Sequence, residues 1–118
     1  MKHDGELIKS LVFDDRGLMP AIVVDQAGQV LMLAYVDQEA VRRTLRDGET
    51  WFYSRSRQEY WHKGATSGNT QEVLSIEVDC DADALLIRVH QRGSGACHTG
   101  SYSCFARALA TNGAVDEL

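Results

Sequence analysis

The chain has 118 residues, with 12 Lys and Arg against 17 Asp and Glu, a formal net charge of −5 and three cysteines. Its 44% hydrophobic and 25% charged residues are typical of a single globular domain, which excludes wholesale disorder, collagen and a disulfide scaffold. The acidic balance argues against a general binder of nucleic acid or anionic membranes, because attraction to phosphate requires positive charge. No signal-peptide core follows the polar N-terminus, and the apolar stretch between Asp25 and Asp37 is too short to span a membrane. We therefore expect a cytoplasmic protein with reduced thiols.

The first predicted elements are a β-hairpin and a helix. Residues 21–24 and 30–36 are β-prone runs, and the turn between them contains Gly28, which favours a hairpin. Asp37 is a suitable N-cap and Gly48 a suitable left-handed C-cap, so the sequence predicts a short helix between them.

The second half of the chain is richer in strands. Residues 50–54 and 59–62 are aromatic strand candidates, and residues 73–78 and 85–89 alternate between apolar and polar positions. The apolar positions of the 73–78 run fall on one predicted face: Leu74, Ile76 and Val78. The tail at residues 103–110 is predicted as a short helix. Together these patterns favour one α+β domain over residues 1–118, with an antiparallel or mixed sheet and one or two short helices.

An acidic turn carries the first candidate chemistry. Asp79, Asp81 and Asp83 are spaced so that their carboxylates converge on a hard cation, although aspartate is also common in solvated turns. Cys80 lies among them, where the carboxylates disfavour a free thiolate. Because a coordinated thiol is held deprotonated, this position favours metal binding.

The other two cysteines, Cys97 and Cys104, lie in a loop rich in Gly and Ser. They are either buried structural cysteines or metal ligands. With Cys80 they would complete a three-thiolate zinc site whose fourth position is open to water, the arrangement of a catalytic site. His98 is a candidate proton shuttle, with a fourth zinc ligand or a plain loop histidine as alternatives.

A third group combines basic and hydroxyl side chains around a glycine-containing loop at residues 64–69. Such side chains and exposed backbone N–H groups are typical of phosphate binding, whereas the alternative is a solvated hairpin and a flexible loop. The candidate phosphate contacts are Arg55, Arg57, Lys63, Thr66 and Ser67.

Four motifs in this order resemble one enzyme family. They are S-R-S-R at residues 54–57, W-x-K-G-x-T-S-G at 61–68, D-C-D-x-D-A-L-L at 79–86 and A-C-H-T-G-x-x-S-C-F at 96–105. The pattern is similar to that of the phosphoribosyl-AMP cyclohydrolases of histidine biosynthesis and runs from about residue 13 to residue 105. The chain resembles the monofunctional form, without a fused phosphoribosyl-ATP pyrophosphatase domain.

The resemblance implies hydrolysis of the N1–C6 bond of the adenine ring in 1-(5-phosphoribosyl)-AMP. It implies one Zn²⁺ per subunit on Cys80, Cys97 and Cys104, and Mg²⁺ on the three aspartates. It also implies a homodimer in which one subunit supplies Cys80 and the other supplies Cys97 and Cys104. The expected partners are therefore a second copy of the same chain and, as substrate, a small phosphorylated nucleotide. Two alternatives stay open: a non-catalytic module stabilised by zinc and magnesium, and a cysteine redox sensor.

Overall fold

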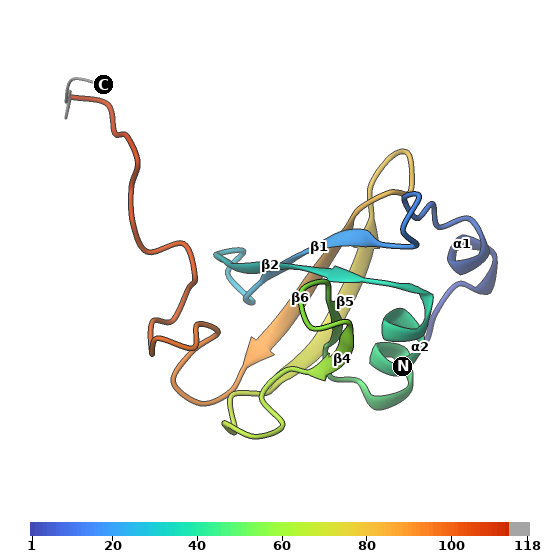
Figure 1. Ribbon diagram of the computed structural model, residues 1–118, viewed down its shortest axis with the longest axis horizontal. Helices are drawn as coiled ribbons and strands as arrows, with labels where there is room; N and C mark the ends of the chain where they lie inside the picture. Colours follow the sequence, from blue (N-terminus) through green and yellow to red (C-terminus); the bar gives the residue numbers. More distant parts are fainter. Residues whose placement is uncertain (114–118) are drawn as a thin grey trace.

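The structure is a computed structural model and is described for residues 1–113. The elements in chain order are α1 (Gly5–Lys9), β1 (Met19–Val24), β2 (Val30–Val36), α2 (Gln38–Asp47), β3 (Trp51–Ser54), β4 (Glu59–His62), β5 (Gln71–Val78) and β6 (Leu85–Gln91). Four strands form a mixed sheet in the order β2-β1-β6-β5, and β3 and β4 form a separate antiparallel pair (Figure 1). This arrangement confirms the predicted α+β class.

The centre of the sheet is the parallel pair β1 and β6, flanked by antiparallel neighbours on both sides. Alternate residues of these strands are buried, as the apolar alternation of residues 85–89 predicts: Met19, Ala21, Val23, Leu85, Ile87 and Val89. Phe52 of β3 is fully buried and joins the same core, which ties the small sheet to the large one. Each large side chain buried in this way stabilises the fold by about 1.5–3 kcal/mol.

The hairpin and the helix follow their sequence signals. β1 and β2 pair as an antiparallel hairpin, and the side chain of Asp37 caps α2 by accepting the N–H of Ala40 at 2.8 Å. The helix ends at Gly48, whose φ of 68° lies in the left-handed region that glycine adopts without strain. α2 packs against β2 and β3.

Two predicted features are wrong, and both for non-local reasons. Leu74 is 48% exposed, because a bulge leaves it unpaired while Val73 and Ser75 pair with Val89 and Arg88 in turn. The predicted helix at residues 103–110 is absent. Instead, the N–H of Cys104 donates to the Leu31 carbonyl at 2.7 Å, and the following residues run away from the body (Figure 1).

The short helix α1 was not predicted from the sequence. α1 is capped by Asp4, whose carboxylate accepts the N–H groups of Glu6 and Leu7. The signal was present, since an Asp N-cap precedes an acidic first turn and Lys9 occupies the last turn. Among residues 1–113, no helix is both long enough and apolar enough to cross a membrane.

Candidate active site

The three aspartates converge in the turn between β5 and β6. Asp79 organises this turn, because its carboxylate accepts the backbone N–H groups of Asp83 at 2.9 Å and Ala84 at 3.1 Å. One carboxylate oxygen from each of Asp79, Asp81 and Asp83 lies within 4.8 Å of the others, and all three residues are exposed. Three oxygen donors at this spacing are suited to a hard divalent cation.

The carboxylates also perturb one another. Hydrogen bonding to Asp81 and then to Asp79 raises the pKa of Asp83 from 3.8 to about 6. Partial desolvation raises the pKa of Asp79, but the N–H donors of Asp83 and Ala84 outweigh it and lower the pKa overall. A bound cation would remove the mutual repulsion that holds a proton on Asp83.

Cys97 and Cys104 come together in a tight loop after β6. The Ala96 N–H donates to the Tyr102 carbonyl at 2.9 Å and the Cys97 N–H to the Ser101 carbonyl at 3.2 Å, which closes the loop. The Thr99 hydroxyl, 3.0 Å from the Cys97 Sγ, lowers the pKa of that thiol. Cys104 is exposed overall, but partial desolvation of its thiol raises the pKa, and the neighbouring Cys97 raises it further.

Cys80 lies elsewhere in the same chain. It is exposed in the aspartate turn, at one end of β6, whereas the loop with Cys97 lies beyond the other end (Figure 1). In the described part of the chain, the three aspartates are the only set of three or more potential ligands that converge. One chain therefore pairs two of the cysteines and leaves the third apart.

The loop after β4 and the cysteine loop line one cavity of about 370 Å³. Its walls include two exposed hydroxyl side chains and the exposed His98, next to Cys97. Of the residues predicted for the site, the cavity gathers Lys63, Thr66, Ser67, Cys97 and His98.

Three basic residues predicted as phosphate contacts have different surroundings. Lys63 is buried, and its Nζ donates to the Ala96 carbonyl at 2.6 Å. Arg55 and Arg57 lie in the β3–β4 turn, outside that cavity. The Arg55 guanidinium stacks 3.9 Å from the centre of the Tyr35 ring, and Arg57 is exposed.

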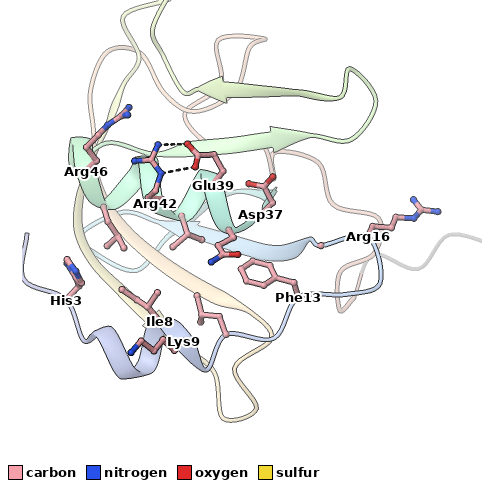
Figure 2. A pocket seen from close by; sticks show the side chains of 14 residues that line it. His3, Ile8, Lys9, Phe13, Arg16, Asp37, Glu39, Arg42 and Arg46 are labelled. Carbon is pink, nitrogen blue, oxygen red and sulfur yellow. Dashed lines mark hydrogen bonds and ion pairs between the residues drawn. The ribbon is translucent and has the colours of Figure 1, made fainter.

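A larger cavity of about 980 Å³ lies between α1 and α2 (Figure 2). Its apolar wall includes Ile8 and Phe13, and on its rim Glu39 binds Arg42 through two hydrogen bonds. None of the residues predicted for the site lines it, so its size does not make it the reaction centre.

The α+β domain carries a carboxylate turn, a thiol pair and a hydroxyl-lined cavity, and a cavity with convergent polar groups of this kind is typical of an enzyme that acts on a small molecule. Comparison with known proteins narrows this class. The family model for phosphoribosyl-AMP cyclohydrolase matches residues 32–106, so the chain belongs to that family. The matched range contains every residue predicted for the site.

Curated relatives agree with the family assignment. The chain is 53% identical over 109 residues to a phosphoribosyl-AMP cyclohydrolase of Pelotomaculum thermopropionicum, covering 92% of this chain and 84% of that protein. It is 57% identical over 90 residues to the Geotalea daltonii cyclohydrolase, covering 75% of this chain and 71% of the relative. It is 59% identical over 99 residues to the histidine biosynthesis bifunctional protein HisIE of a Nostoc species, covering 83% of this chain. The chain spans about half the length of this bifunctional relative (46%).

Proposed function

We propose that this protein hydrolyses the N1–C6 bond of the adenine ring in 1-(5-phosphoribosyl)-AMP, an early step of histidine biosynthesis. One observation carries the proposal: the Cys97–Cys104 pair and His98 lie beside a cavity lined by Thr66 and Ser67. Family membership supplies the substrate, because the relatives are named for this reaction.

The donor chemistry fits zinc, provided that a second copy supplies Cys80. Thiolates are preferred zinc ligands, and three of them leave one position open. When bound, zinc supplies Lewis-acid activation of water near neutral pH. The exposed position of Cys80 and the apolar side chains exposed on the tail, Phe105 (65%) and Leu109 (101%), support a homodimer whose subunits share the site.

The protein's own side chains then have separate tasks. The hydroxyls of Thr66 and Ser67 hold a phosphate at the cavity wall. Asp79, Asp81 and Asp83 would hold Mg²⁺, which would supply positive charge for a substrate phosphate. Arg55 and Arg57 remain candidates for the second phosphate.

His98 moves the proton. Water adds its oxygen to C6, which is electrophilic because alkylation at N1 makes the ring a cationic amidine. The C6–N1 bond breaks, C6 becomes the carbon of a carboxamide, and the imidazole of His98 transfers one proton of the attacking water to the departing N1. The other water proton is released to solvent as the cationic ring becomes a neutral product. The exposed His98 at the cavity wall is free to exchange this proton with solvent.

The test combines turnover and metal content on one sample of the purified full chain. We expect ring opening of phosphoribosyl-AMP, which is monitored by the change in ultraviolet absorbance. We also expect the sample to contain about one zinc ion per chain. Chelation should abolish turnover and added zinc should restore it. Stoichiometric zinc without turnover would indicate a structural module, and a zinc-free protein that forms a Cys97–Cys104 disulfide on oxidation would indicate a redox sensor.

A further inference from the structure

Lys63 occupies an unusual environment for a lysine. Among residues 1–113 it is the only buried lysine or arginine, at 7% exposure. An ammonium group removed from water is destabilised unless hydrogen bonds and nearby negative charge replace its hydration. The groups that contact Lys63 therefore indicate which part of the site its positive charge serves.

The contacts of its side chain are with the cysteine loop and with the adjoining strand β4. The Nζ donates to the Ala96 carbonyl at 2.6 Å and lies 5.6 Å from the centre of the Trp61 ring. Burial lowers the pKa of Lys63, and the nearby thiols of Cys104 and Cys97 oppose this shift. The ammonium group is thus directed at the loop that carries two predicted zinc ligands.

The backbone fixes Lys63 in this position. Its N–H donates to the Thr50 carbonyl at 3.1 Å, directly before β3. The following residue, Gly64, has a φ of +80°, and a Cβ there would lie 2.3 Å from the backbone of Asn69. The chain therefore turns sharply after Lys63 and closes the 64–69 loop beside it.

The two halves of the cysteine loop have different anchors. Cys104 is fixed to β2 through its own N–H and the Leu31 carbonyl at 2.7 Å. On the other side, the buried Ala96 directly precedes Cys97, and Lys63 binds its carbonyl. Lys63 is thus the side chain that ties the Cys97 half of the loop to the β4 end of the small sheet.

We propose that Lys63 is a positioning residue for the zinc site, holding Cys97 through the Ala96 carbonyl with its positive charge beside both thiols, and that it is not a ligand of substrate phosphate. This inference rests on the proposed function and deepens it. It also reassigns Lys63 from the set of expected phosphate contacts, since a phosphate would have to replace Ala96 as the partner of a buried ammonium. Thr66 and Ser67, which are exposed on the same cavity, need no such rearrangement.

The test compares zinc affinity with substrate affinity in Lys63→Met, measured on the full chain by competition with a chelating dye and by steady-state kinetics. Loss of an outer-sphere contact typically weakens metal binding 10- to 100-fold, and we expect a loss of about this size. With zinc at saturation, we expect KM to stay within about threefold of the parent value. The matched control is Thr66→Ala, which alters the same cavity without touching Ala96 and should keep zinc affinity within about twofold.

Two results would overturn the inference: unchanged zinc affinity in Lys63→Met, or a KM raised tenfold or more at saturating zinc, as removal of a phosphate contact predicts. An equal loss of zinc affinity in Thr66→Ala would also overturn it. If Lys63→Met does not fold, Lys63→Ala, which also removes both the donor and the charge, takes its place with the same criteria. A parent protein that binds zinc but does not open the ring would refute the proposed function instead, because the comparison of zinc affinities needs no turnover.

Discussion

Two inactive variants should restore each other if the zinc site is shared between subunits. β6 runs from Leu85 to Gln91, about 20 Å at about 3.3 Å per residue, and Cys80 and Cys97 lie beyond its opposite ends. Two thiolates on one zinc lie only about 4 Å apart, given Zn–S bonds of about 2.3 Å. We therefore expect Cys80→Ser and Cys97→Ser each to abolish turnover, because each removes one ligand from every site.

Mixing the two variants regenerates an intact site. In a heterodimer, the Cys97→Ser chain supplies Cys80 to the Cys97–Cys104 pair of the other chain, while the second site lacks two ligands. Random assortment of equal amounts makes about half the dimers heterodimers with one working site of two, so the mixture should recover about a quarter of parent activity. The assay is ring opening after unfolding and refolding of the mixed chains, with heterodimers counted by native mass spectrometry.

A matched mixture controls for nonspecific recovery. Cys97→Ser mixed with Cys104→Ser should stay inactive, because both variants damage the same half of the site. Absence of recovery in the first mixture despite verified heterodimers, or equal recovery in the control, would refute the shared site.

Three further predictions concern the cysteine loop, its hydrogen bond to Asp25 and the aspartate turn. Gly95→Ala should lose bound zinc on dialysis, because its Cβ would lie 2.4 Å from the Tyr102 backbone; Gly100→Ala meets nothing within 4 Å and should keep zinc at a strain cost of about 1–2 kcal/mol. Tyr102→Phe removes a 2.7 Å hydrogen bond that holds the pKa of Asp25 below 3.8, so urea unfolding at pH 7 should show a loss of about 1–2 kcal/mol. That loss should fade as pH falls through the depressed pKa, because the stabilisation requires ionised Asp25; a constant loss would contradict the assignment. The pKa of Asp83, raised to about 6, predicts Mg²⁺ binding about tenfold weaker at pH 5 than at pH 7.5 by calorimetry, because the cation must displace a proton. Affinity independent of pH would count against this site.

Local signals predicted much of the fold. The β1–β2 hairpin and the two caps of α2 depend on residues close in sequence, and the structure confirms them. The outward turn of Leu74 depends on pairing with β6, and the extended tail depends on a hydrogen bond to Leu31. Contacts between distant segments decide these features, so no local pattern contains them.

In the candidate site, too, local features were predictable and contacts between distant segments were not. The three aspartates converge within one turn, as their spacing predicts. Burial of Lys63 was not predictable, because its partner Ala96 lies in a distant segment. Their residue type suggested that Cys80 and Cys97 belong to one zinc site, but the division of the ligands between two chains came only from resemblance to a family, because it depends on a contact that one sequence does not encode locally.

The parallel pairing of β1 with β6 has a consequence for assembly during synthesis. β1 can pair with β6 only after β6 has been synthesised, because Ala21 of β1 lies opposite Leu85 of β6. The three antiparallel hairpins form instead from segments that are neighbours in the sequence. Pairing across such a sequence separation slows folding, because the chain must close a long loop before the contact contributes stability. The cysteine loop follows β6, so its thiols leave the ribosome after every strand of the sheet. We therefore expect zinc to be acquired at the end of folding, after the sheet is complete.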